Sequence, residues 1–176
     1  MKTLFKTEIT AAVLIISLLM LVGCGNSYVM LHYDDFSHMQ DALSFTMRTV
    51  PGEEAVYTYG AQDKKLGELQ YIISDDTGLA MGTLSFRMAE VDYIADFATP
   101  EKPGAAGIDI TDMASGTDRI GTCEISYYYG GNTAFAVWER EGMAYSVAVV
   151  YSDGYEEIAP GWDSVYSYVV AIISTK

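Results

Sequence analysis

The chain has 176 residues and a formal net charge of −14, from 24 acidic and 10 basic side chains. A negative excess of this size repels phosphate backbones and anionic lipid headgroups, so the composition argues against a nucleic-acid-binding protein. Hydrophobic residues make up 50% of the chain, which is enough for one globular domain with its own core.

Residues 1–23 have the layout of an export signal. Lys2 and Lys6 give a positive start, and an apolar run over residues 9–22 follows without a charge. This run is shorter than the roughly 20 residues that a helix needs to span a bilayer. We therefore expect a cleaved signal peptide and not a permanent membrane span.

The apolar run ends in Leu21, Val22, Gly23 and Cys24, and this tetrapeptide resembles the lipobox of bacterial lipoproteins. In that motif the cysteine thiol accepts a diacylglyceryl group, and a peptidase then cuts before the cysteine. Two acyl chains give stable membrane attachment, whereas one gives only reversible binding. The motif implies a mature chain that starts at Cys24 and is lipid-anchored on the extracytoplasmic side of the cell membrane. The alternative is an ordinary secretory signal with an incidental cysteine.

Cleavage would leave 153 residues with a net charge of −15, which suits a single domain. We expect residues 24–33 to be the lipidated N-terminus and a short linker, and residues 34–176 to be the domain. Once Cys24 carries lipid, Cys123 has no partner for an intrachain disulfide. We expect Cys123 to be a small buried side chain and not a reactive thiol.

The domain is expected to open with an amphipathic helix over residues 34–47. Apolar side chains recur there at spacings of three and four, namely Phe36, Met39, Leu43 and Met47, which is helical periodicity. The preceding aspartates suit a helix start, and the Pro51-Gly52 pair ends the pattern.

Alternation of apolar and polar residues predicts antiparallel strands at 55–60, 68–74, 83–88, 122–129, 133–140 and 144–151. Turns rich in glycine and aspartate separate these runs, including one at 64–67 and one at 75–78. Residues 91–121 show no period, so we expect a long connection with a short strand at 109–111.

The chain closes with an expected helix over residues 162–176. Trp162, Val165, Val169 and Ile172 follow Pro160-Gly161 at helical spacing. The complete pattern predicts an α+β fold, in which an antiparallel sheet of about six strands in a meander is flanked by an N-terminal and a C-terminal helix.

Three aspartates are candidate metal ligands. Asp109, Asp112 and Asp118 lie in one acidic segment, and Ca²⁺ prefers carboxylate oxygens on loops. Their spacing is not that of an EF-hand, and the favoured alternative is a solvated acidic loop. We therefore expect no bound cofactor, with Ca²⁺ as the candidate to test.

Tyrosine is the unusual component, because all 14 tyrosines follow the lipobox. Tyr127, Tyr128 and Tyr129 are consecutive, and strand alternation puts Tyr128 on the opposite face from its neighbours. Exposed rings there would suit a glycan or peptide ligand. In the alternative, helices cover the rings and only their hydroxyls reach water.

Three segments occur in a fixed order: GTLSFRMAEVDYIADF (82–97), AFAVWEREGMAYSVAV (134–149) and SVYSYVVAII (164–173). In this arrangement the chain resembles an uncharacterised extracytoplasmic domain family of Gram-positive bacterial lipoproteins and anti-sigma-factor ectodomains. That resemblance implies no catalytic residue.

The leading functional hypothesis is a membrane-anchored, non-enzymatic binding or sensing module for an envelope protein, peptide or glycan. Its support is that both histidines, His32 and His38, lie near the start of the domain and that no nucleophile elbow occurs. One alternative is an envelope hydrolase or metal-dependent enzyme that uses Asp109 and Asp112 with Glu124 or Glu139. Another is a structural or assembly protein of the envelope.

Overall fold

A computed structural model describes residues 29–93, 110–155 and 160–175. Its elements are β1 (Met30–Tyr33), α2 (Phe36–Ala42), β2 (Tyr57–Ala61), β3 (Leu66–Ser74), β4 (Ala80–Glu90), the 3₁₀ turn η1 (Val91–Tyr93), β5 (Ala114–Ile120), β6 (Cys123–Gly130), β7 (Thr133–Arg140), β8 (Met143–Tyr151) and α4 (Trp162–Ser174). The predicted α+β class with an N-terminal and a C-terminal helix is confirmed. The expected six strands are corrected to eight in the described part of the chain.

All of these strands form one antiparallel sheet in the order β1-β2-β3-β4-β8-β7-β6-β5. The sheet therefore consists of two meanders, β1 to β4 and β5 to β8, which join where β4 pairs with β8. Leu84 lies opposite Val149 at this junction, and Phe86 lies opposite Val147. The two long central strands thus carry the core from one meander into the other.

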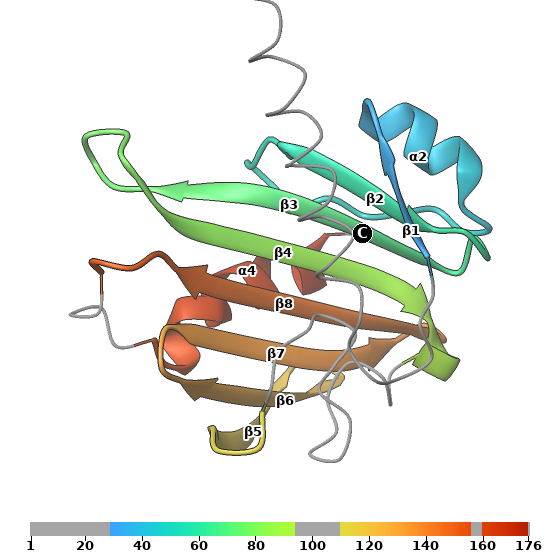
Figure 1. The fold of residues 1–176 in the computed structure, drawn as a ribbon. Coiled ribbons are helices and arrows are strands. Elements are labelled where there is room, and N and C mark those ends of the chain that lie inside the picture. The colour runs from blue at the N-terminus through green and yellow to red at the C-terminus, as the bar shows by residue number, and fades with distance from the viewer. Residues whose placement is uncertain (1–28, 94–109, 156–159, 176) are drawn as a thin grey trace, which may run out of the picture.

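Both helices contribute to the apolar cluster on one face of the sheet; α4 lies behind the central strands in Figure 1, and α2 lies beside β1 at the margin of the sheet. Met39 of α2 and Val165, Val169 and Ile172 of α4 are at most 1% exposed and belong to one apolar cluster with the strands. The ring of Trp138 stacks on Tyr145 at 5.4 Å within this core. The predicted apolar stripe of the C-terminal helix is confirmed.

The opposite face, which we call the second face, is turned toward the viewer in Figure 1. It carries a smaller apolar cluster that contains Ala61, Leu66, Ala89, Ile110, Phe135, Val137, Ala144 and Ala148. Ile110 is 4% exposed, so the chain leading into β5 packs on this face. Alanine recurs in the cluster, and small side chains let other groups approach the strands closely.

The N-terminal helix is shorter than expected, because α2 has only 7 residues. Leu43 has extended backbone geometry and ends the helix. The following segment bonds elsewhere: Ser44 N–H donates to the Lys64 carbonyl at 2.9 Å, and Met47 N–H donates to Gln40 Oε1 at 2.7 Å. Met47 is nevertheless 3% exposed. Its position in the apolar pattern therefore predicted its burial correctly, although the residue is not in a helix.

Two strands were missed by the sequence pattern. Residues 30–33, assigned to the linker, form β1, and all of β5 lies in the segment 91–121 that was assigned to a connection. Both are edge strands with several exposed residues, so burial imposes little apolar alternation on them. The expected strand at 109–111 is wrong for residues 110 and 111, and Asp109 lies outside the described residues. The predicted turn at 64–67 is also too long, since Leu66 and Gly67 belong to β3.

No helix among the described residues has the length and hydropathy needed to cross a membrane.

Candidate binding site

Polar residues form a row across the middle of the second face. The strand register pairs His32 with Tyr59, Tyr59 with Glu68, Glu68 with Arg87 and Arg87 with Ser146. Five neighbouring strands, β1, β2, β3, β4 and β8, each supply one member of this row. Three of the members are buried although polar: Glu68, Arg87 and Ser146.

A charge pair lies at the centre of the row. Glu68 is 4% exposed and Arg87 is 9% exposed. The Oε2 atom of Glu68 accepts a hydrogen bond from Nε of Arg87 at 2.7 Å and forms an ion pair with Nη2, also at 2.7 Å. Its Oε1 atom accepts from Nε2 of Gln70 at 2.6 Å. Both carboxylate oxygens therefore have donors, which is the condition under which a buried carboxylate is tolerated.

The guanidinium of Arg87 is only partly satisfied. Its Nη1 atom is buried and has no hydrogen-bond partner. Because Nε and Nη2 both face Glu68, the planar guanidinium directs Nη1 away from β3. The adjacent second-face positions of β8 carry only small side chains, Ala144, Ser146 and Ala148. A buried donor without an acceptor costs about 1–3 kcal/mol, so an oxygen placed beside Nη1 would recover a hydrogen bond.

Three rings lie beside this charge pair. The centroid of His32 is 5.3 Å from that of Tyr59 and 6.3 Å from that of Tyr57, and the two tyrosine rings are 6.4 Å apart. Tyr57 is 46% exposed. Burial raises the pKa of Tyr59, and the negative charge of Glu68 raises it further. The Tyr59 hydroxyl therefore stays protonated at neutral pH and keeps its hydrogen-bond donor.

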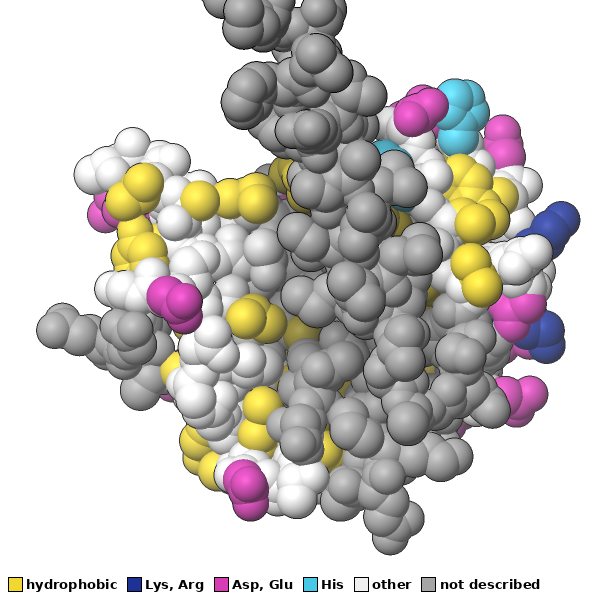
Figure 2. Space-filling view, in the orientation of Figure 1, with side chains coloured by type: hydrophobic (Ala, Val, Ile, Leu, Met, Phe, Trp, Pro, Cys, Tyr) yellow, Lys and Arg dark blue, Asp and Glu magenta, His cyan; other side chains and the backbone are white. Residues whose placement is uncertain are grey.

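We call His32, Tyr57, Tyr59, Glu68, Gln70 and Arg87 the second-face site. It combines a buried guanidinium that has a spare donor with partly exposed rings. In Figure 2, the part of this face that is not under grey atoms shows mostly hydrophobic and uncharged groups, and Lys or Arg side chains appear only at one margin. The arrangement fits recognition of a ligand oxygen beside a flat carbon surface.

The candidate calcium ligands are not assembled within the described residues. Asp112 is an exposed turn residue before β5, and Asp109 lies outside the described residues. Asp118, on β5, accepts a hydrogen bond from Nε1 of Trp162 at 3.0 Å, so it fastens the start of α4 to the sheet. The described part of the chain contains no group of three or more His, Cys, Asp or Glu side chains placed to hold a metal ion.

The carboxylates considered for an enzyme are also separated. Asp112 lies near the end of β6, since Met113 contacts Gly130 there. Glu124 is the second residue of β6 and Glu139 is near the end of β7, at the opposite end of the sheet. The structure therefore does not bring Asp112 together with Glu124 or Glu139.

The three consecutive tyrosines alternate between the faces, as predicted. Tyr127 stacks on Trp162 at 4.6 Å and lies 6.3 Å from Tyr129, on the face that α4 covers. Tyr128 packs on the second face, 6.1 Å from Phe135. All three are partly buried, so the rings mainly join strands and helix.

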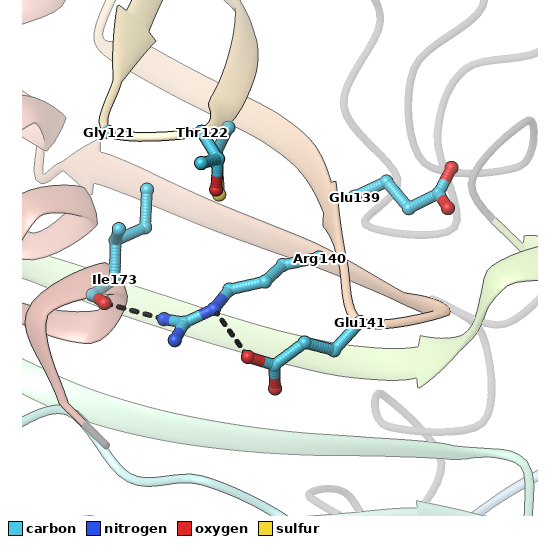
Figure 3. A pocket seen from close by; sticks show the side chains of 7 residues that line it. Gly121, Thr122, Glu139, Arg140, Glu141 and Ile173 are labelled. Carbon is cyan, nitrogen blue, oxygen red and sulfur yellow. Dashed lines mark hydrogen bonds and ion pairs between the residues drawn. The ribbon is translucent and has the colours of Figure 1, made fainter.

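A hollow of about 520 Å³ lies at one end of the sheet, lined by Gly121, Thr122, Cys123, Glu139, Arg140, Glu141 and Ile173 (Figure 3). Arg140 donates to the Ile173 carbonyl and to Glu141 Oε1, while Arg48 donates to the Thr175 carbonyl at 2.8 Å. Positive charges near the C-terminus of a helix interact favourably with the helix dipole. These arginines thus anchor α4, and Cys123 is 4% exposed, as expected for a packing residue.

A Ser-Asp-His group at the start of α2 resembles catalytic machinery only in composition. The Ser37 hydroxyl donates to Asp35 Oδ1 at 2.8 Å, and the same oxygen accepts the His38 N–H at 2.9 Å. The serine hydroxyl therefore bonds to the carboxylate and not to the imidazole. A catalytic serine would need its hydroxyl bonded to a general base such as the imidazole. Asp35 acts as a helix N-cap.

No family model, no curated protein and no solved structure matches this chain. Leu21, Val22, Gly23 and Cys24 lie outside the described residues, so the lipobox remains a prediction from sequence.

Sequence reasoning missed the second-face site, although one signal was present. Glu68 and Arg87 each occupy the outward position of a strand whose alternate residues are apolar. The turn at 75–78 makes these two strands a hairpin, and its register sets the two charges opposite each other. Opposite charges at matched positions of a predicted hairpin are therefore the signal that could have found the pair.

Proposed function

We propose that the mature chain is a lipoprotein anchored through Cys24 on the extracytoplasmic side of the membrane, and that its domain works by binding a ligand without catalysing a reaction. The observation that carries the proposal is Arg87, which is 9% exposed yet keeps Nη1 without a partner, on a strand two places along the sheet from the rings of β2. A buried ion pair adds little stability, because replacing it by apolar residues is often neutral or stabilising. We therefore propose that this pair is present for recognition.

The chemistry of the second-face site narrows the chemical class of the ligand. Nη1 of Arg87 is a charge-assisted donor, so it favours a carboxylate or carbonyl oxygen. Tyr57 and Tyr59 offer ring surfaces for the flat face of a sugar or an apolar side chain. The chain carries a net charge of −14, which opposes polyanionic ligands. We propose an envelope glycan or peptide long enough to extend from the rings on β2 to an oxygen bound at Arg87 on β4, about 10 Å away across the sheet.

Calorimetric titration with peptidoglycan fragments tests this proposal. The protein is the mature chain with Cys24→Ser, and the probes are the intact muropeptide, the peptide-free disaccharide and the free stem peptide, which separate a glycan from a peptide ligand. We expect Tyr57→Ala to weaken binding about tenfold, as loss of a ring contact worth roughly 1 kcal/mol or slightly more implies. We expect Arg87→Lys to weaken it more, because lysine lacks the planar fork.

Tyr166→Ala is the matched control, because Tyr166 is 41% exposed but belongs to α4, on the other face of the sheet. This control is expected to bind like the parent. Failure of all three fragments to bind, or equal losses in Tyr57→Ala and Tyr166→Ala, would refute the second-face site as the binding surface.

A further inference from the structure

Basic residues gather at one end of the sheet. We call the end at which β1 begins the near end, and the opposite end the far end. The near end carries the β2–β3, β5–β6 and β7–β8 turns and the end of α4. Five of the six Lys and Arg residues in the described part of the chain lie there: Arg48, Lys64, Lys65, Arg119 and Arg140. The exception, Arg87, is in the middle of the sheet.

The two ends differ in net charge. At the near end, the five basic residues are partly offset by eight acids: Asp41, Asp63, Glu90, Asp92, Asp118, Glu124, Glu139 and Glu141. At the far end, the turns and flanking segments carry Asp34, Asp35, Glu53, Glu54, Asp75, Asp76, Asp112 and Asp153, without a described Lys or Arg. Among the described residues, the excess of negative charge is therefore larger at the far end than at the near end.

Some of the opposite charges at the near end are in direct contact. Lys65 Nζ lies 2.9 Å from Glu90 Oε2, and Arg48 Nη2 lies 3.2 Å from Glu141 Oε2. Bacterial membranes present anionic headgroups, and charges within about one Debye length, ~8–10 Å, dominate the contact energy. The near end, which has the smaller net negative charge, is repelled less by such a surface than the far end.

The chain between Cys24 and Met30, which we call the tether, is short enough to favour the near end as the end closer to the membrane. Met30 pairs with Ala61 at the near end, and six residue steps separate it from Cys24, a reach of about 20 Å when fully extended. β4 has 11 residues and thus spans roughly 36 Å. With the far end against the bilayer, Met30 would stand higher than the tether can reach.

We infer that the near end faces the membrane and contacts the phospholipid headgroups. Val29 is 51% exposed and Leu31 is 42% exposed, so two aliphatic side chains beside the tether meet the interface in this orientation. The acidic far end then points away from the bilayer. This inference rests on the proposed lipid anchor at Cys24.

A fluorophore at each end of β3 tests the orientation. Gln62→Cys lies in the near-end turn and Leu79→Cys lies at the far end, and both positions are exposed and uncharged. Lipidated Cys24 and buried Cys123 leave the new thiol as the reactive one. The full lipidated proteins are reconstituted in vesicles of phosphatidylglycerol and phosphatidylcholine that carry a nitroxide quencher on the headgroups.

We expect quenching to be several-fold stronger for the label at Gln62→Cys than for the label at Leu79→Cys. Equal quenching at both positions, or stronger quenching at Leu79→Cys, in protein that floats with the vesicles would overturn the orientation while leaving the anchor intact. Protein that carries no lipid by mass spectrometry and does not float would overturn both the anchor and this inference. The Cys24→Ser protein should stay in solution, since the near end has no excess of positive charge with which to bind the bilayer by itself.

Discussion

Glu68 and Arg87 stand directly opposite each other on β3 and β4, and Oε2 of the glutamate lies 2.7 Å from both Nε and Nη2 of the arginine. Around them the second face is lined largely by alanine and other apolar side chains. Removing two charges from water is costly, and only close mutual contact offsets that cost. Each partner is therefore tolerated in the fold because the other is present.

Breaking this pair should be more damaging than removing it. Glu68→Ala leaves the guanidinium of Arg87 buried without a counter-ion, so we expect the free energy of unfolding to fall by about 3–5 kcal/mol. The double change Glu68→Leu with Arg87→Met should recover most of that loss and should also abolish ligand binding. Urea unfolding followed by circular dichroism measures both. A loss below about 1 kcal/mol for Glu68→Ala would mean that the pair is solvated.

The last helix offers a second stability test. Val169 is 0% exposed and packs in the main core, so Val169→Asp places an unpaired carboxylate there. We expect a loss of at least about 3 kcal/mol in the free energy of unfolding. Ser167→Asp is the control, because Ser167 is on the exposed side of the same helix. Equal melting temperatures for the two variants would contradict the observed register of α4.

The elements that sequence predicted well are those in which burial imposes a pattern. Strands β3, β4, β6, β7 and β8 each bury alternate apolar residues under the helices, and α4 buries a stripe at helical spacing. Strand β5 reads ASGTDRI and is held at the edge through its backbone pairing with β6. Backbone hydrogen bonds leave no signature in side-chain type, so this strand was not predictable from periodicity.

The candidate site was hidden for a related reason. The pairing of Glu68 with Arg87 depends on the register of a hairpin, which a one-residue slip would change. Asp118 shows the converse, since it was grouped with acidic neighbours by sequence but bonds to Trp162, 44 residues away. Chemical type was readable from the sequence in both cases, whereas the partner was set by the fold.

The lipid anchor gives a test in the cell. Cys24→Ser removes the thiol that accepts the diacylglyceryl group, so we expect loss of fatty-acid labelling. The protein should then remain uncut or leave the membrane fraction. Metabolic labelling and cell fractionation measure these outcomes, and Cys123→Ser is the control that should still be labelled. Labelling that persists in Cys24→Ser would contradict the lipobox.

Tyr71 makes the stability of the domain depend on alkaline pH. Its side chain is 2% exposed, and its hydroxyl oxygen accepts the Val50 N–H at 3.1 Å. Burial raises the pKa of Tyr71 to about 12, against the opposing effect of the Val50 hydrogen bond and with a smaller raising contribution from Glu53. The ordinary pKa of a tyrosine side chain is 10.0, so between these two values the native state holds this proton where the unfolded state has lost it.

Between pH 10 and about 12 the unfolded state therefore binds fewer protons, and the free energy of unfolding falls as the pH rises. Below this window both states are protonated and the contribution is constant. At about 1.4 kcal/mol per unit, the loss across the window is roughly 2–3 kcal/mol. Tyr71→Phe cannot ionise, so its stability should fall less steeply above pH 10, and at neutral pH it should lose only about 1 kcal/mol with the Val50 hydrogen bond. Urea unfolding of parent and variant at several pH values measures both effects. Other groups titrate equally in the two proteins, so any difference between the two curves comes from Tyr71. Parallel curves would show that Tyr71 ionises normally in the folded state.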